Sequence, residues 1–501
     1  MLTHILEASA VIFSPLTFCS IFGGVLLGII FGIVPGLTAT LAVILLIPIT
    51  YGLDPISGIA VLIGVYIGGI SGGLVSATLI GMPGTPSSIT TTFDGFPLTK
   101  KGQAAKALKV GISANLVGTL FGWCFLITVA PQLAQIALKF GPIEYVAVIF
   151  FGFTTVISLS GDSVVKGIIV TLLGLVLCTI GTEPVLGTAR NTFGFSSLNG
   201  GISAVPAMIG LFVLGEVFRS LESKDPPIKA KDVSFRDSGS FSLKEIRASI
   251  GNFIRSGFIG VSIGILPGIG GSLANFVSYD QAKKASKEPE TFGTGNIQGI
   301  VASETANNAV IGGALIPMMA LGIPGDVVSA ALMGGLQLHG LEPGPMLFAE
   351  NPVFIWGIYI SFLLSAFIMF GSMMLAGTRV LPYILLIPKR FLLPVVVVAS
   401  VVGCYNLDYS ITDMWTTLAF GILGYFLSKY KFPLPPLVIS LVLGSMFEKQ
   451  LRLALMDGKG DLFGPVAGSP IAMLFLLIAL FSIVFSLYRI HKGKKISAAD
   501  S

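Results

Sequence analysis

Apolar residues in this chain come in runs that are too long for the core of a water-soluble domain. Residues 56–80, 353–375 and 470–487 are examples, and each reaches the roughly 17–25 residues that a helix needs to cross the hydrocarbon of a bilayer. Hydrophobic residues make up 53% of the chain and charged residues 11%, with a mean hydropathy of +0.90. Soluble domains carry about 25% charged residues. The pattern therefore predicts an all-α polytopic membrane protein.

The most hydrophilic stretch divides the chain into two parts of similar length. Because basic loops stay in the cytoplasm, we place this stretch inside. We expect a first membrane repeat at 1–218, a cytoplasmic basic linker at 219–255, a second membrane repeat at 256–488 and a cytoplasmic tail at 489–501. The basic residues of the linker and the tail include Lys224, Lys229, Lys231, Arg236, Lys244, Arg247, Arg489, Lys492, Lys494 and Lys495.

A Pro-Gly pattern occurs twice in each part, in the same order. The segment GIVPG at 32–36 aligns with GILPG at 264–268, and GMPG at 81–84 aligns with GIPG at 322–325. Each second segment follows a Gly-rich span. An internal repeat is a strong architectural signal, and the pairing indicates that the two parts share one fold.

The charges that flank the breaks predict that the two repeats are inverted. After the first break, residues 50–57 carry no Lys or Arg, whereas the equivalent segment of the second repeat contains Lys283 and Lys284. After the second break the bias reverses, with Lys100 and Lys101 in the first repeat only. The positive-inside rule then places matching loops on opposite sides. We predict about 11 transmembrane helices plus two re-entrant hairpins, tipped at 35–36 and 267–268, with the N-terminus outside and the C-terminus inside.

Pro-Gly breaks within a membrane offer backbone groups to a ligand, as in secondary transporters built from inverted repeats. The N–H groups that open the next half-helix attract an anion, while carbonyls and hydroxyls suit a cation such as sodium. We predict substrate binding by Pro35, Gly36, Thr38, Thr85, Ser87, Pro267, Gly268, Gly270, Gly271, Ser272, Asn307 and Asn308. We assign cation coupling to Glu304, Pro83, Gly84, Pro324 and Gly325.

Each of these assignments has a simpler alternative. A Pro-Gly break can merely kink a packed helix. Helical spacing places Glu304, Asn307 and Asn308 on one face, yet Glu304 could instead lie at headgroup level and stabilise a helix N-terminus. Asp326 follows a break directly, where capping is as good an explanation as function. Asp94 has the pattern of a turn residue near the cytoplasmic face.

Signatures of an enzyme are lacking in the sequence. The histidines, His4, His339 and His491, are too scattered for a metal cluster or a charge relay. No GxxxxGK[ST] phosphate loop occurs, so we expect no ATP hydrolysis by this chain. We predict that the chain is not an enzyme and needs no cofactor; sodium is the single metal that the pattern suggests, as a coupling ion in place of a proton.

Together these motifs resemble the large membrane subunit of the tripartite tricarboxylate transporters, the TctA family. The resemblance rests on the four Pro-Gly segments, on DGFPLTKKGQA at 94–104, on SETANNA at 303–309 and on HGLEPGP at 339–345, and it covers roughly residues 20–350. It implies a bacterial inner-membrane transporter that imports di- or tricarboxylates such as citrate, driven by a sodium or proton gradient. It also implies a periplasmic solute-binding protein and a small four-span membrane subunit as partners.

Other functions are compatible with the same pattern. The same architecture could take up aromatic carboxylates. A passive carboxylate-selective channel would show uptake without ion dependence or a binding protein. In a membrane scaffold, substitutions at the breaks would affect folding alone. An elevator movement of the broken elements against a scaffold is a hypothesis that the hairpins suggest, and nothing in the sequence identifies the carboxylate, the coupling ion or the oligomeric state.

Overall fold

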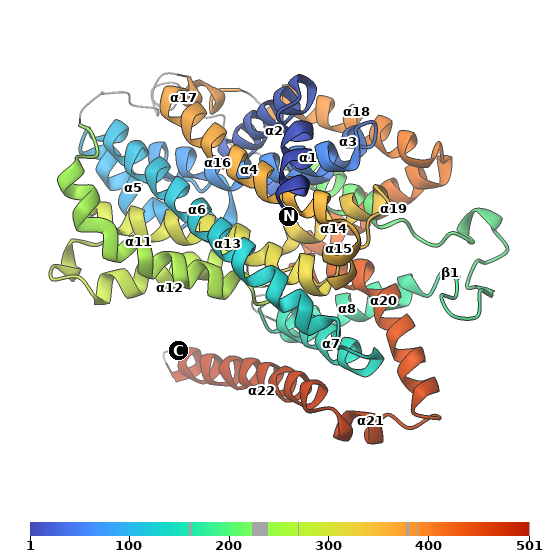
Figure 1. Ribbon diagram of the computed structural model, residues 1–501. Helices are drawn as coiled ribbons and strands as arrows, with labels where there is room; N and C mark the ends of the chain where they lie inside the picture. Colours follow the sequence, from blue (N-terminus) through green and yellow to red (C-terminus); the bar gives the residue numbers. More distant parts are fainter. Residues whose placement is uncertain (160–162, 223–238, 269, 377–379, 388, 500–501) are drawn as a thin grey trace.

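The computed structural model describes residues 1–501 except 160–162, 223–238, 269, 377–379, 388 and 500–501. Helices form nearly all of the regular secondary structure in the described residues (Figure 1), as predicted. The exception is an antiparallel hairpin of two short strands, β1 (Gly181–Thr182) and β2 (Ala189–Arg190). The linker residues Lys224, Lys229, Lys231 and Arg236 lie outside the described residues.

The first part of the chain contains a helix on each side of its first break. Ser14 caps α2, and Asp54 caps α4, each followed by Pro at the first helical position, where its missing N–H costs no bond. The elements are α1 (Leu2–Ile12), α2 (Pro15–Ile33), α3 (Ala39–Thr50), α4 (Pro55–Leu79), η1 (Pro86–Ser88), α5 (Thr91–Lys100), α6 (Ala104–Ala137), α7 (Pro142–Leu159), α8 (Val164–Cys178), β1, β2, η2 (Ser196–Leu198), α9 (Ala204–Met208), η3 (Ile209–Leu214) and α10 (Gly215–Glu222).

The second part repeats this order of helix, break and helix. Its long middle helix, α13, spans Ile297–Leu321, where the sequence predicts a crossing near 297–321. The elements are α11 (Leu243–Gly264), α12 (Gly270–Lys284), η5 (Pro289–Thr291), α13, α14 (Val327–Leu338), α15 (Pro345–Glu350), α16 (Pro352–Ala376), α17 (Leu381–Ile384), α18 (Lys389–Asp408), α19 (Ile411–Lys429), α20 (Pro435–Asp457), α21 (Phe463–Gly468) and α22 (Pro470–Ala499).

Several helices of the described chain suit a membrane. Five are long and apolar enough to cross one, namely α2, α4, α6, α16 and the continuous helix Ala204–Glu222 formed by α9, η3 and α10. Shorter apolar helices, such as α3, α7, α8 and α14, accompany them. The chain is therefore a multi-pass membrane protein. The number of crossings, their direction and the bounds of the four predicted segments remain predictions.

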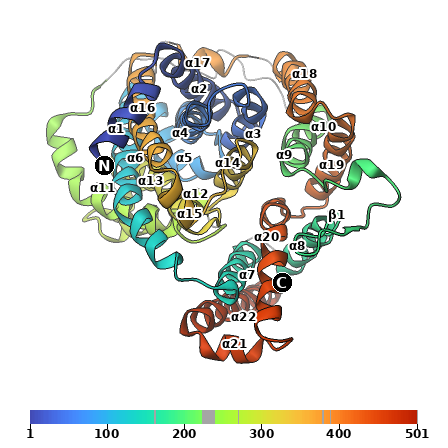
Figure 2. The ribbon, with the colours of Figure 1, turned by 45° about the vertical axis from the view of Figure 1, so that its right-hand side comes forward.

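The helices gather into three groups (Figure 2). The largest holds α1 to α6 and α11 to α16, in which α4 packs against α2, α3 and α16, and α13 packs against α6, α11 and α12. A second group contains α9, α10, α18 and α19, and a third contains α7, α8, α20 and α22. All four breaks belong to the largest group, in which α4 and α13 are almost wholly buried.

Glycines allow the corresponding helices of the two parts to pack in the same way. A Cβ atom added at Gly72 of α4 would lie 2.5 Å from the carbonyl oxygen of Ile29 in α2. One added at Gly313 of α13 would lie 2.7 Å from the carbonyl oxygen of Val261 in α11. When the Pro-Gly breaks are aligned, Gly72 corresponds to Gly313 and Ile29 corresponds to Val261. The structure thus has the same backbone contact in both parts, which supports the internal repeat.

The crossing of α6 and α13 offers a test of this packing. A Cβ atom at Gly312 would lie 2.2 Å from the carbonyl oxygen of Gly122, so Gly312→Val is expected to force the two helices apart and to destabilise the fold by roughly 1–3 kcal/mol. Thermal unfolding in detergent measures the effect. Gly371→Val in α16, where an added Cβ meets nothing within 4 Å, is the control. Equal melting temperatures for the two variants would contradict the close approach.

Candidate functional site

In each half of the chain, the second Pro-Gly break packs against the C-terminal end of the helix that precedes the first Pro-Gly break. A Cβ atom added at Gly84 would lie 2.1 Å from the carbonyl oxygen of Gly32, and one at Gly325 would lie 2.6 Å from the carbonyl oxygen of Gly264. The backbone N–H of Gly268 also donates to the carbonyl oxygen of Gly325 over 2.7 Å. The two breaks of a half therefore lie together in the structure.

Contacts between the halves join these pairs of breaks. A Cβ atom at Gly271, in the first turn of α12, would lie 2.7 Å from Oδ1 of Asn307 and 3.0 Å from Cβ of Ser87. Asn275 of α12 donates from its side-chain amide to the carbonyl oxygen of Ser87. The hydroxyl of Thr85 lies 3.2 Å from that of Ser87. Polar groups of η1, α12 and α13 thus meet at Gly271, as close backbone approach at the breaks predicts.

Asp326 and Tyr66 make a second contact between the halves. The buried hydroxyl of Tyr66 in α4 donates to Oδ2 of Asp326 over 2.5 Å. The other carboxylate oxygen accepts the backbone N–H of Ser329 over 2.7 Å, which caps α14. Asp326 therefore serves as the helix cap that the sequence allowed, and it also ties the second break of one half to the middle helix of the other.

Glu304 is fully buried in α13 and is bonded to neutral groups. The hydroxyl of Thr91 donates to its Oε1 over 2.5 Å, and the side-chain amide of Asn115 in α6, with its NH2 group turned toward Glu304, donates to Oε2 over 2.7 Å. Glu304 lies beyond the first two turns of α13, which begins at Ile297, so it is not placed to stabilise the N-terminus of this helix; its depth in the membrane stays a prediction. A carboxyl group without a basic partner inside a membrane protein is a functional candidate.

Asn307 and Asn308 point to different neighbours. Oδ1 of Asn308 accepts hydrogen bonds from Ser71 over 2.7 Å and from Thr119 over 3.3 Å, so this amide joins α13 to α4 and α6. The amide of Asn307 lies near Glu304 and Gly271, but neither its nitrogen nor its oxygen makes a hydrogen bond of ordinary geometry within the described structure. Asn307 is thus open to a ligand in a way that Asn308 is not.

The remaining predicted residues lie at the breaks, with varied surroundings. Pro35 and Gly36 are half-buried at the first tip, and Thr38 caps α3 by accepting the backbone N–H of Leu41. Pro267 is buried, and Gly270 and Ser272 are half-buried in the first turn of α12. The contacts of Thr38 do not place the first tip beside Asn307, so its substrate role stays a prediction.

Asp94 has a structural role that differs from the predicted turn. It lies within α5 rather than in a turn, because the Pro97 that suggested a turn is accommodated in the helix. Its buried carboxylate accepts the hydroxyl of Tyr279 over 2.8 Å and the backbone N–H groups of Gly293, Gly295 and Asn296 over 2.8–2.9 Å. It therefore fastens the loop before α13 to the first half.

Sequence reasoning missed four polar residues that contact Asp326, Glu304, Asn308 or Ser87, namely Tyr66, Thr91, Asn115 and Asn275. Asn115 and Asn275 could have been found, because an amide within an apolar helix follows the same rule that selected Glu304. Tyr66 and Thr91 lacked such a signal. Every charged side chain that is buried in the described structure is acidic: Asp94, Glu183, Glu304, Asp326 and Asp413.

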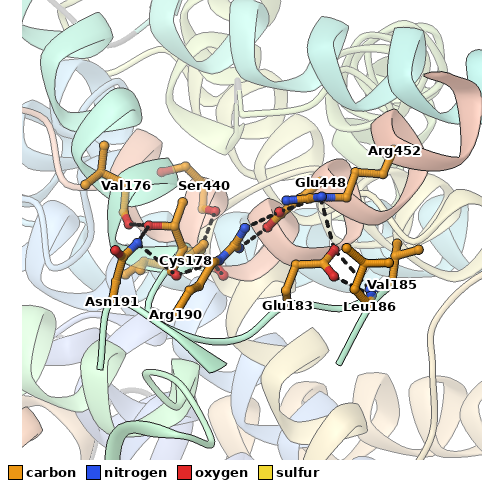
Figure 3. Close-up of polar contacts among 12 residues, drawn as sticks. Val176, Cys178, Glu183, Val185, Leu186, Arg190, Asn191, Ser440, Glu448 and Arg452 are labelled. Atoms are coloured by element: carbon orange, nitrogen blue, oxygen red, sulfur yellow. Dashed lines mark hydrogen bonds and ion pairs between the residues drawn. The ribbon is translucent and has the colours of Figure 1, made fainter. Parts of the chain in front are cut away.

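A second polar cluster lies outside the breaks and holds the β1–β2 hairpin to α20 (Figure 3). The guanidinium of Arg190 binds both carboxylate oxygens of Glu448, which raises the pKa of Arg190 above its ordinary value. Arg452 lies 3.0 Å from both Glu448 and Glu183. Since the sequence shows no spacing between residues 190 and 448 to suggest contact, this cluster could not be predicted.

Removal of Arg190 should release the hairpin. Because a hydrogen-bonded charge pair of this kind contributes roughly 1–3 kcal/mol, Arg190→Ala is expected to accelerate cleavage of the loop by chymotrypsin, for example at Phe193, which is 76% exposed. Arg219→Ala, which breaks an exposed pair with Glu216 on one helix, is the control. Unchanged cleavage of Arg190→Ala would mean that other contacts hold the loop.

Comparison with known proteins identifies the family. The family described as the tripartite tricarboxylate transporter TctA family matches residues 18–439. The chain belongs to this TctA family. It is similar to an Agrobacterium vitis protein described as an uncharacterized 52.8 kDa protein in the TAR-I ttuC' 3' region, with 36% identity over 488 residues that cover 96% of this chain and 95% of that protein.

A second relative covers half of the chain. An uncharacterized Agrobacterium vitis protein of the TAR-II ttuC' 3' region is 35% identical over 237 residues, which are 47% of this chain and 97% of that protein. No solved structure matches the chain. The TctA family is a family of transporter components and not of enzymes, so the chain is a membrane component of a transporter.

Proposed function

We propose that this TctA-family chain is the translocating subunit of a cation-gradient-driven secondary transporter in the bacterial inner membrane. It imports citrate-like di- and tricarboxylates, delivered by a periplasmic solute-binding protein, and works with a small four-span membrane subunit. The tripartite character of the family supports both partners. We propose import because the binding protein would deliver the substrate from the periplasmic side of the membrane.

The observation that carries the proposal is that two breaks and the middle of α13 meet at buried polar groups. Gly271, Ser87 and Asn307 come from three elements and meet where the first turn of α12 begins. Backbone N–H groups at such a helix start attract carboxylates, and the hydroxyl and amide groups add hydrogen bonds. A packed kink needs none of these groups, so the site interpretation explains more of the structure than a kink does.

The acidic character of the interior supports cation coupling. A carboxylate substrate that enters this region meets Glu304 and Asp326, and the described residues bury no Lys, Arg or His beside them. Like charges that approach in a low-dielectric region repel strongly. A cation or proton that binds together with the substrate removes this repulsion, and we assign to Glu304, which has no basic partner, the balancing of this positive charge.

Uptake into proteoliposomes tests the proposal. Purified chain and its small subunit are reconstituted, and labelled citrate, succinate and an aromatic carboxylate are supplied with or without a sodium or proton gradient and the cognate binding protein. We expect uptake of citrate or succinate that needs both the gradient and the binding protein. Flux that is independent of any gradient would instead indicate a channel, and uptake restricted to the aromatic compound would change the substrate class.

A further inference from the structure

Two buried amides at the meeting point of the breaks have unused oxygen atoms. Asn307 is 1% exposed and Asn275 is 0% exposed. Oδ1 of each has no hydrogen-bond partner within the described structure, whereas the NH2 group of Asn307 lies toward Glu304. Leaving a buried polar atom unpaired costs about 1–3 kcal/mol, and native proteins keep such groups where a ligand uses them. Their concentration between α12 and α13 points to a bound species.

The neighbouring atoms are oxygens of neutral groups. Gly271 lies between Asn307 and Ser87, since a Cβ atom added there would be 2.7 Å from Oδ1 of Asn307 and 3.6 Å from Oγ of Ser87. The hydroxyl of Thr85 is 3.2 Å from the hydroxyl of Ser87, and Asn275 contacts the carbonyl oxygen of Ser87. Three elements of the chain, η1, α12 and α13, therefore bring hydroxyl and amide groups close to Gly271.

The first half of the chain contains an internal comparison. When Pro83 is aligned with Pro324, Asn307 corresponds to Tyr66 and Thr85 corresponds to Asp326. Thr85 with Ser88 and Asp326 with Ser329 form the same capping arrangement. At one of these equivalent places the Tyr66 hydroxyl bonds directly to Asp326. At the other, no hydrogen bond joins Asn307 to Thr85 within the described structure, so the bond between the halves is made at only one of the two equivalent places.

The chemistry around Asn307 favours a small hard cation. Hydroxyl, amide and carbonyl oxygens are the ligands that hard cations prefer. Glu304 lies one helical turn before Asn307, and Asp326 lies next to Gly270, whose added Cβ would be 3.8 Å from Cβ of Asp326. These two carboxyl groups make the region attractive to a positive charge, and the neutral ligands suit a monovalent ion better than a divalent one.

We propose that Asn275, Asn307 and the hydroxyl groups of Thr85 and Ser87 form a sodium site beside Gly271. The assignment rests on the proposed function, in which a cation gradient drives uptake, and it names the ion and its ligands. Glu304 then balances the charge of the ion from one turn away instead of binding it. Sodium bound here would also lie at the start of α12, where it compensates a substrate carboxylate.

Thermal unfolding of the purified full-length protein in detergent tests the site without any transport. Sodium chloride is titrated against choline chloride at constant ionic strength. We expect sodium to raise Tm of the wild type by roughly a few degrees, because a ligand that binds the folded state stabilises it in proportion to its saturation. In Asn307→Ala and Asn275→Ala, the sodium concentration that gives half of this shift should rise roughly tenfold or more.

Two further variants make the result decisive. Tyr66→Phe, at the position equivalent to Asn307, should keep the sodium response of the wild type. Asn307→Ser, which retains an oxygen, should respond more than Asn307→Ala, which guards against a simple folding defect. A sodium response that is the same in Asn307→Ala, or absent from the wild type, would overturn the site. A sodium response that depends on Asn307 in a protein without gradient-driven uptake would keep the site and refute the proposed function.

Discussion

Replacing Glu304 by Gln should lower gradient-driven carboxylate uptake by roughly tenfold or more while the protein still folds and inserts. Gln keeps the size of the side chain, and its carbonyl oxygen can accept the hydrogen bond from Thr91, while rotation of the Asn115 amide accommodates its NH2 group. The negative charge is lost, and with it the charge balance for a coupling cation. Uptake and the yield of monodisperse protein are measured on the same preparation.

A surface substitution of the same kind is the control for this experiment. Glu290→Gln changes an exposed residue of η5 and should leave uptake unchanged. Wild-type uptake by Glu304→Gln would remove Glu304 from coupling and leave it a purely structural role between α5, α6 and α13. If Glu304→Gln also lowers the uptake that the wild type shows without a gradient, Glu304 would act in the passage of the substrate instead.

Substituting Ala for Gly271 is the second change with a large expected effect. The added Cβ would lie 2.7 Å from Oδ1 of Asn307, a distance that requires one of the two groups to move. We expect a loss of roughly tenfold or more in apparent substrate affinity, because misplaced ligands in a preorganised site lose the energy of their contacts. Uptake measured over a range of substrate concentrations separates this effect from a loss of protein.

Gly251→Ala in α11, where an added Cβ meets nothing within 4 Å, is the control for replacing a helical Gly by Ala without a steric contact. Unaltered affinity of Gly271→Ala would show that the substrate binds elsewhere. Gly268 is a poorer choice for this experiment. Its φ of +79° favours glycine, and an added Cβ would lie 2.2 Å from the Val156 side chain, so a substitution there disturbs folding whether or not a ligand binds.

Hydrophobicity and repetition predicted the all-α class and the places where helices are interrupted. The breaks separate α2 from α3 and α11 from α12 where the Pro-Gly pairs occur, because the lack of Cβ at Gly36, with a φ of +94°, permits the turn. The extent of α13 also follows from its sequence. Such features are local, so a single sequence contains enough information to find them.

The contacts between side chains at the site could not be predicted from the sequence as well as the helices could. Helical spacing put Asn307 and Asn308 on one face, yet one residue of separation turns them to different neighbours, and the sequence does not say which helix covers which side. The pairing of Tyr66 with Asp326 depends on how two distant segments pack. Asp94 was misjudged because its loop partners, Gly293 to Asn296, come from the other half.

The acidic interior also predicts which step of an alternating-access cycle responds to the membrane potential. When cations accompany the substrate, the charges of Glu304 and Asp326 are offset, and the loaded protein reorients with little net charge. When Glu304 and Asp326 are ionised in the unloaded protein, an inside-negative potential drives their charges outward, by about 2.3 kcal/mol for each full charge at 100 mV. Voltage should therefore accelerate the return of the empty transporter rather than the delivery of its substrate.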